Sequence, residues 1–333
     1  MKPSKNLMPP ARNQKCIINT DLDGIFSGLI LHNLLNWEIV GFCDSAESIW
    51  IDKNRCDNLY DCIFIDIFVY PKNIRSIDQH IISVDEAHNL MLSDNNNKLN
   101  PNLINKRNFL PNESYFTKYP FGTVHFIIAW LERNGLNIEI DLLKKLTGKF
   151  SVIDLFLRAD DTFYTSTFSG YVENASKWWR WLNGFSNNGK VINIFSEHII
   201  NYKKGFDRTS SLNLKKRIGD FLQDAPFYCD SPDGGFKGKK SMGNNFPNPN
   251  FKTYVKFLAE SSGLKCFNLD FSFSLLKGKS KRTSLNKDQL NQLKERKFHE
   301  DLFSYAFVRS SKKSDSFSYT LLDVNFNRGR LKQ

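Results

Sequence analysis

Residues 16–31, CIINTDLDGIFSGLIL, place two carboxylates at the junction of two secondary-structure patterns. The first four residues are a short, mostly apolar run, which is typical of a buried strand. Apolar side chains then recur at helical spacing, at Phe26, Leu29, Ile30 and Leu34. Asp21 and Asp23 lie between the two patterns and are followed at once by Gly24. The stretch therefore predicts a strand, an acidic turn and a helix.

Three further runs continue the strand pattern, at residues 37–44, 59–69 and 81–84. The run 59–69 is rich in Ile, Phe and Val without alternation, as expected of a strand buried on both faces. Because helical stretches connect these strands in part, we expect an α/β fold with a mostly parallel sheet flanked by helices. Residues 91–120 are polar and broken by Asn and Pro, so they predict a long loop.

Helical patterns occupy the middle of the chain, at residues 121–135, 140–161, 173–185 and 191–206. The amino-acid composition changes from about residue 226, where a segment rich in Gly, Asn and Lys predicts a loop or an insertion. One helical pattern and several strand patterns follow it, at residues 253–263, 265–276, 303–311 and 317–326.

The length and the charge distribution of the chain suggest two domains. A chain of 333 residues is long enough for both, and we expect a flexible N-terminus at residues 1–14. A first domain with a helical linker would span residues 15–200, and a smaller, basic α+β domain would span residues 201–333. Residues 1–200 contain 20 Lys and Arg against 22 Asp and Glu, whereas the rest contains 26 against 13. This basic half suits a polyanionic partner, because clustered cations release the counterions of a phosphate backbone; a solvated surface is the alternative.

Other features of the composition exclude several classes of protein. No apolar run approaches the roughly 20 residues that a membrane-spanning helix needs, and the first fifteen residues have no apolar signal core. The six cysteines show neither CxxC spacing nor the framework of a disulfide scaffold. We therefore expect a cytoplasmic protein with reduced, mostly buried cysteines and without a zinc knuckle.

Acidic residues follow or end several of the predicted elements. They are Asp21 and Asp23, Asp66, Asp85, and Asp160 and Asp161. In a parallel sheet, the loops after the strands meet at one edge, where ligands bind. Several carboxylates at close range cannot all stay ionised unless positive charge lies between them. Divalent cations are the usual solution, and two ions about 4 Å apart can hold a phosphate and activate a water. Taken singly, each Asp could instead be a helix cap or a turn residue.

The order of these motifs resembles the DHH phosphoesterases, in their RecJ-like branch, over roughly residues 15–165. NTDLDGIFSG resembles the first motif of the family, FIDIF the second, and RADDTF the fourth, acidic motif. VDEAH occupies the place of the Asp-His-His triplet that gives the family its name, and YPFGTVHFIIAWLE is similar to the helix start that follows.

The resemblance implies a fold and a set of site residues. It implies two Mn²⁺ or Mg²⁺ ions, or one, held by Asp21, Asp23, Asp66, Asp85, Asp160 and Asp161, with Asn19 as a further oxygen ligand. Asp66 and His88 would be catalytic, with His88 steadying the phosphate. Gly122 and Thr123, at a predicted helix start, could offer backbone N–H groups to a phosphate. DHH enzymes also carry a smaller C-terminal domain that grips the substrate.

Two departures from the family pattern bear on catalysis. Asn19 stands where the family has a His, and Glu86 and Ala87 stand in place of the two His of the triplet. Oxygen ligands suit Mg²⁺ or Mn²⁺ better than borderline metals. The site could hold one strong metal, prefer Mg²⁺, or have lost catalysis while keeping a cleft.

Another segment competes for the third motif. SIDQH, with Asp78 and His80, mimics the triplet but precedes the predicted strand 81–84, so it would lie at the opposite edge from Asp85 and His88. We favour Asp85 and His88 and keep His80 as a possible phosphate ligand. DEAH also spells a helicase box, but the chain has no Gly-rich nucleotide loop. His125, on an apolar helix, is expected in the core.

The basic second half supplies possible contacts to nucleic acid. The residues proposed there are Lys237, Lys239 and Lys240; Arg180, in the KWWRWL segment before residue 200, is proposed as a further contact. The tryptophans of that segment could stack on unpaired bases, pack in the core or meet a partner protein.

The leading hypothesis is a hydrolase that cleaves phosphodiester bonds of single-stranded nucleic acid or short oligonucleotides with Mn²⁺ or Mg²⁺, such as an exonuclease. The alternatives are a DHH-scaffold protein that binds nucleic acid or nucleotides with weakened catalysis, and an accessory subunit of a nucleic-acid-processing complex.

Overall fold

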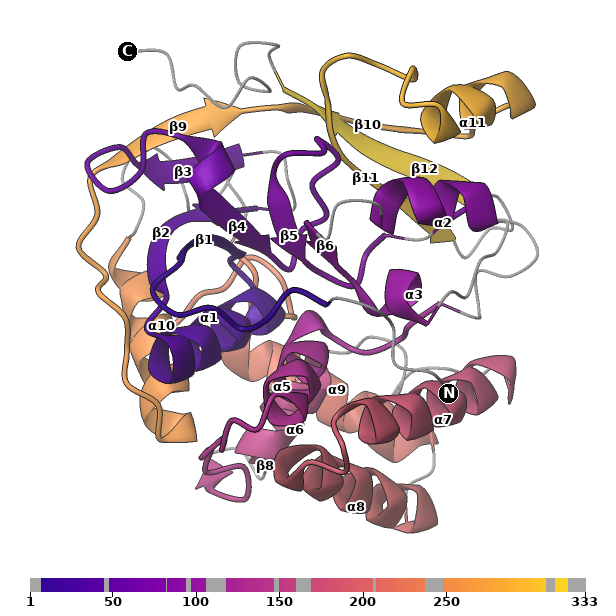
Figure 1. Ribbon diagram of the computed structural model, residues 1–333. Coiled ribbons are helices and arrows are strands. Elements are labelled where there is room, and N and C mark those ends of the chain that lie inside the picture. Colours follow the sequence, from indigo (N-terminus) through magenta and orange to yellow (C-terminus); the bar gives the residue numbers. More distant parts are fainter. Residues whose placement is uncertain are drawn as a thin grey trace.

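The chain forms an α/β fold, as expected from the sequence (Figure 1). The computed structural model describes residues 7–44, 48–81, 83–93, 97–105, 118–146, 150–159, 169–205, 208–236, 248–309 and 315–322. A seven-stranded sheet has the order β6-β5-β4-β1-β2-β3-β9. Its strands are β1 (Lys15–Asn19), β2 (Glu38–Cys43), β3 (Ser48–Asp52), β4 (Cys62–Ile65), β5 (Arg75–Ile77), β6 (Lys98–Leu99) and β9 (Phe273–Lys277). The strands from β6 to β2 pair in parallel, and β3 and β9 continue the sheet antiparallel.

The central strands are buried on both faces of the sheet. In β1, Cys16 and Ile18 belong to the core under the helices, whereas Ile17 faces the opposite core. On the first face lie α1 (Leu22–Leu35), α5 (Thr123–Arg133) and α10 (Pro249–Ser262), and Figure 1 shows the larger helices gathered on this side. Successive side chains of a strand point to opposite faces of the sheet. Because both faces of this parallel sheet are covered, apolar side chains of the same strand enter both cores.

A smaller sheet covers part of the other face. It has the order β10-β12-β11, with β10 at Lys279–Thr283, β11 at Leu302–Arg309 and β12 at Asp315–Leu321. Phe303 of β11 packs edge-on against Phe64 of β4, with ring centroids 5.5 Å apart. The two sheets are therefore joined through apolar contacts as well as through the chain.

The remaining elements complete the layers. They are η1 (Leu59–Asp61), α2 (Glu86–Ser93), α3 (Pro101–Ile104), β7 (Lys145–Leu146), β8 (Phe150–Ser151), α6 (Val152–Arg158), α7 (Ser169–Phe185), α8 (Lys190–Gly205), α9 (Arg208–Gln223) and α11 (Lys287–Lys294).

None of the described helices is both long enough and apolar enough to cross a membrane. All six cysteines are free, and all but Cys266 are buried, which confirms the expectation of mostly buried cysteines.

The prediction of a strand at residues 81–84 is wrong. The fourth parallel strand is β5, at Arg75–Ile77, and it hydrogen-bonds to β4 and β6. Ile81 and Val84 are instead buried in a small core with residues of β11 and β12. Their apolar character reflects that core and not a strand. The short strand β3 and the helix α9 were not anticipated either.

Part of the chain beyond residue 200 belongs to the main sheet and its helical layer. β9 pairs with β3, and α10 packs on α1. The domain boundary predicted at residue 200 stays a prediction. At the other end, Trp130 and Trp37 donate hydrogen bonds to the carbonyls of Met8 and Ala11, so residues 7–14 of the expected flexible terminus lie against the fold.

Candidate functional site

The acidic turn after β1 is built from tight backbone contacts. Asp21 caps α1, since its Oδ1 accepts a hydrogen bond from the N–H of Gly24 at 3.0 Å. A Cβ atom on Gly24 would lie 2.3 Å from the carbonyl oxygen of Asn19. Only glycine permits this approach of the first helical turn to the end of β1. Asp21 and Asp23 are thereby brought to the carboxyl edge of the sheet.

Asp66 lies at the centre of the site, directly after β4. Its backbone has a φ of 62°, in the left-handed region that Asp tolerates better than most residues. Its carboxylate accepts hydrogen bonds from Asn19 Nδ2 at 3.0 Å, His80 Nε2 at 3.0 Å and Thr123 Oγ1 at 2.7 Å. Asp66 is 2% exposed, so these contacts hold a buried carboxylate in one orientation. Unusual backbone conformations of this kind cluster at functional sites.

Asp23 lies against the beginning of α5. Its Oδ2 and Oδ1 accept hydrogen bonds from the N–H groups of Thr123 and Val124, both at 2.7 Å. A Cβ atom on Gly122 would lie 2.9 Å from Asp23 Oδ2, so glycine makes room for the carboxylate. The Thr123 amide, predicted as a phosphate donor, is thus occupied by a carboxylate from α1. Asp23 thus satisfies two of the N–H groups that the first turn of a helix leaves without a partner.

Asp78 and His80 follow β5, the strand beside β4. Asp78 Oδ1 accepts hydrogen bonds from the His80 N–H at 2.8 Å and from Asn100 Nδ2 at 3.0 Å. Asp78 is fully buried, and its Oδ2 has no hydrogen-bond partner among the described residues. The structure therefore brings SIDQH to the carboxyl edge, because the strand ends at residue 77 and not at residue 84.

The preference for Asp85 and His88 as edge residues is corrected by the structure. Asp85 Oδ1 accepts a hydrogen bond from the His88 N–H at the start of α2, and its Oδ2 pairs with Lys294 of α11 at 2.7 Å. His88 is buried; its Nδ1 accepts from the Val84 N–H, which leaves Nε2–H to donate to the Tyr305 hydroxyl at 3.1 Å. These partners come from α11 and β11, so the two residues support the junction with the small sheet.

Several other predicted residues lie outside the described residues or away from the cluster. Those that the structure does not describe are Asp160, Asp161, Lys237, Lys239 and Lys240. Arg180 is exposed on α7. Trp178 and Trp179 are buried and pack against Tyr119 and Phe121, which confirms core packing for these two rings.

The electrostatics show an excess of negative charge in the cluster. Burial raises the pKa of Asp21 and of Asp23 well above the usual range, and the charge of Asp66 raises both further. Burial opposes ionisation of Asp66 too, but the hydrogen bonds from His80, Thr123 and Asn19 outweigh it and lower the pKa of this carboxyl. Partial burial disfavours a charged His80, yet Asp66 outweighs it and raises the imidazole pKa. Asp66 and His80 therefore form an ion pair beside two carboxylates that resist ionisation.

A turn from the second half of the chain completes the acidic site. Leu22 N–H donates to the carbonyl of Asp233 at 3.1 Å, and the Thr20 hydroxyl donates to the carbonyl of Phe236 at 2.8 Å. The charge of Asp233 also contributes to the raised pKa of Asp21. Gly234 has a φ of 83°, and a Cβ there would meet the Tyr254 ring, so glycine is required. The adjacent glycines Gly234 and Gly235 are a sequence signal for a turn, but its place beside Asp21 depends on contacts with residues some two hundred positions earlier.

The donor atoms of the cluster suit a hard cation in their chemistry. Carboxylate and amide oxygens are the ligands that Mg²⁺ and Mn²⁺ take in proteins. Within the described ranges, no three His, Cys, Asp or Glu side chains already converge so that one metal ion would contact them all. Asp21, Asp23 and Asp66 are the described residues that could hold an ion; Asp78, whose Oδ2 has no partner among the described residues, follows the neighbouring strand β5.

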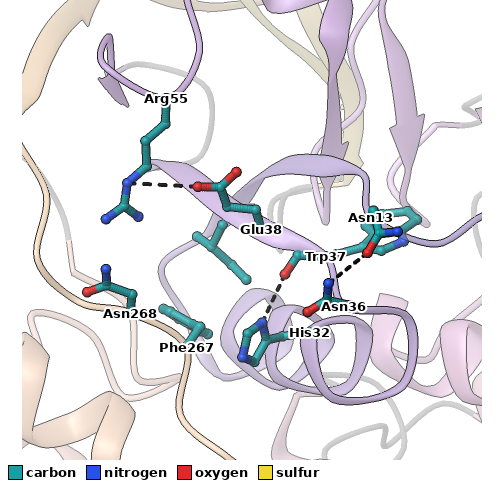
Figure 2. Close-up of a pocket in the computed structure, with 9 residues that line it drawn as sticks. Asn13, His32, Asn36, Trp37, Glu38, Arg55, Phe267 and Asn268 are labelled. Carbon is teal, nitrogen blue, oxygen red and sulfur yellow. Dashed lines mark hydrogen bonds and ion pairs between the residues drawn. The ribbon is translucent and has the colours of Figure 1, made fainter.

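A separate cavity of about 430 Å³ lies at the other edge of the sheet (Figure 2). Its lining includes His32 and Asn36 at the end of α1 and Glu38 at the start of β2. Since β1 and β2 are parallel, the start of β2 lies at the opposite edge from Asn19 and the carboxylates. The cavity therefore shares no residue with the acidic cluster.

Comparisons with known proteins give no further identification. No protein-family model, no curated protein and no solved structure matches the chain.

Proposed function

We propose that the chain is a cytoplasmic, DHH-like phosphoesterase that hydrolyses phosphodiester bonds of single-stranded nucleic acid or short oligonucleotides with Mn²⁺ or Mg²⁺. The observation that carries this proposal is the convergence of Asp21, Asp23 and Asp66 at one edge of the sheet. Shared donors link them, since Asn19 Nδ2 contacts both Asp21 and Asp66, and Thr123 contacts both Asp23 and Asp66. A divalent cation would relieve the repulsion that raises the pKa of two of these carboxyls.

Each residue of the cluster has a distinct part in the proposed reaction. Asp21, Asp23 and Asp66 would hold the cation, with Asp160 or Asp161 as further predicted ligands. The bound cation would supply an activated water and neutralise charge on the phosphate. His80, charged through its pairing with Asp66 and 39% exposed in its side chain, would contact the scissile phosphate or protonate the leaving oxygen. This role replaces the one first expected of His88.

The test compares three variants that differ in their predicted effect. With Mn²⁺ or Mg²⁺, the wild type should release nucleotides from a labelled single strand, and Asp66→Asn should not, although Asn also tolerates the left-handed backbone. His80→Asn should lower the rate by about 10²- to 10⁴-fold, as expected for loss of acid–base catalysis. Asp85→Asn is the matched control and should keep the wild-type rate. The reverse result for His80 and Asp85 would show that the site is assigned to the wrong loop.

One observation favours the alternative of a binding protein with weakened catalysis. Both oxygens of Asp23 accept backbone hydrogen bonds from α5, so this carboxylate already has a structural role. In that case, wild type and Asp66→Asn would be equally inert while still binding the strand. The same assay, with binding followed by fluorescence anisotropy, distinguishes the two functions.

A further inference from the structure

Strand β10 presents a row of basic side chains to solvent. Its sequence, KSKRT, carries Lys279, Lys281 and Arg282, and every residue of the strand is exposed. Among the described residues, none of these three cations has an ion-pair or hydrogen-bond partner. Lys279 and Lys281 are two positions apart, so they lie on the same face of the strand, about 7 Å from each other along it.

The neighbouring strand does not compensate this charge. In the antiparallel register, Lys279 lies opposite Leu321, Lys281 opposite Tyr319, and Arg282 opposite Ser318. These partners on β12 are uncharged. β10 is also the first strand in the order β10-β12-β11, so its outer edge is unpaired in the described sheet. The positive charge is thus concentrated on a strand with one free edge.

The small sheet that contains β10 is linked to the main sheet and to the chain segment that follows Asp66. β9 of the main sheet continues into β10 through Gly278, where a Cβ would lie 2.7 Å from Thr320 Cγ2 (Figure 1). In the same small sheet, β11 packs on the segment that follows Asp66. Tyr70 N–H donates to the Phe303 carbonyl at 2.6 Å, and the rings of Phe68 and Tyr305 lie 5.1 Å apart. Through β11, the small sheet therefore packs on the chain segment that follows β4.

We propose that Lys279, Lys281 and Arg282 on β10 bind the phosphate backbone of single-stranded nucleic acid and hold it for cleavage at the Asp66 cluster. This inference rests on the proposed function, which supplies the polyanionic substrate. An extended nucleic-acid strand presents its phosphates at intervals comparable to the spacing of Lys279 and Lys281. Cations without protein partners lose no ion pair on binding, and they gain affinity by releasing condensed counterions. The assignment also moves the contact surface from the predicted contacts Lys237, Lys239 and Lys240 to a strand that the structure describes.

The experiment compares two triple variants that remove the same charge. Lys279→Ala/Lys281→Ala/Arg282→Ala changes β10. The control, Lys144→Ala/Lys145→Ala/Lys190→Ala, changes exposed residues at β7 and α8. In Figure 1, α8 and β8, the strand that pairs with β7, lie at the opposite end of the molecule from β10. Affinity for a labelled single-stranded oligonucleotide is measured by fluorescence anisotropy at several salt concentrations. Hydrolysis of a small diester, bis-p-nitrophenyl phosphate, is measured in parallel, and circular dichroism melts check that both variants fold.

The β10 variant should bind more weakly, and the slope of log affinity against log salt should shrink by about 2, from a contribution of about 0.7 for each lost phosphate contact. Its rate on the small diester should be unchanged, and the control variant should match the wild type. Equal affinity and slope in both variants would overturn the proposal. So would self-association of the β10 variant with unchanged binding, because the cations would then only protect a sheet edge. If no protein hydrolyses either substrate but binding still depends on β10, the enzyme proposal fails and the surface stands.

Discussion

Replacing Gly122 by alanine should loosen the contact between Asp23 and helix α5. The backbone of Gly122, with φ of −67° and ψ of 158°, is one that alanine adopts without strain. On that ground alone, the substitution would stabilise the protein by about 0.4 to 1 kcal/mol through the unfolded chain. The new Cβ, however, would lie 2.9 Å from Oδ2 and 3.0 Å from Cγ of Asp23. The carboxylate or the helix start must then shift.

The magnitude follows from the hydrogen bonds at stake. Asp23 is 5% exposed and accepts two bonds of 2.7 Å from the first turn of α5. Leaving a buried backbone N–H of α5 without its acceptor costs about 1 to 3 kcal/mol. If the displacement breaks one of the two, the loss exceeds the entropic gain. We expect Gly122→Ala to lower the free energy of unfolding by about 1 to 2 kcal/mol.

The assay is urea unfolding followed by circular dichroism, with the midpoint and the slope both fitted. Gly184→Ala, in α7, is the matched control, because nothing lies within 4 Å of a Cβ at that position. It should stabilise the protein by about 0.5 to 1 kcal/mol, the difference in helix propensity. In an Asp23→Ala background, Gly122→Ala should lose its cost, since the opposing carboxylate is absent. A Gly122→Ala variant as stable as Gly184→Ala, or a cost that persists without Asp23, would refute this reasoning.

Three further predictions concern residues away from the cluster. Burial lowers the pKa of His88 to about 4, below the roughly 6.5 of an unfolded histidine, so the unfolded state takes up the proton first as the pH falls. The contribution of neutral His88 to the free energy of unfolding is therefore complete above about pH 6.5, and it falls by about 1.4 kcal/mol per pH unit down to about pH 4. In urea unfolding across this pH range, His88→Asn should lack this dependence on pH. Trp178→Ala should cost about 3 to 5 kcal/mol in urea unfolding, and Arg180→Ala less than about 0.5, because only Trp178 is buried; similar losses for both would contradict core packing. Diamide should oxidise Cys56 and Cys62, whose sulfur atoms lie 2.8 Å apart, to a disulfide within the tryptic peptide 56–72; mass spectrometry showing both residues still open to alkylation would exclude it.

Much of the acidic site could be predicted because its first part is local. The strand, the Asp21 cap and the helix of residues 16–31 depend on contacts within a few positions, such as Gly24 N–H to Asp21. The continuous apolar run before Asp66 likewise indicates a strand with two buried faces, and β4 confirms it. Local rules for caps and periodicity therefore predicted two of the three loops that form the site.

The third loop could not be chosen from local pattern. Residues 81–84 are apolar and resemble a strand, but their side chains fill a core made by β11 and β12, more than two hundred residues away. The polar segment around Asp78 follows a strand only because β4 and β6 supply hydrogen-bond partners for β5.

The sequence by itself determined the α/β class, the acidic turn and the position of Asp66 after a buried strand. The tertiary structure alone decided that His80, and not His88, meets Asp66, and that the Asp233 turn closes on Asp21. The physical reason is the range of the interactions. Caps and amphipathic periodicity act over a few residues, whereas strand pairing and burial depend on partners whose place along the chain no local pattern reveals.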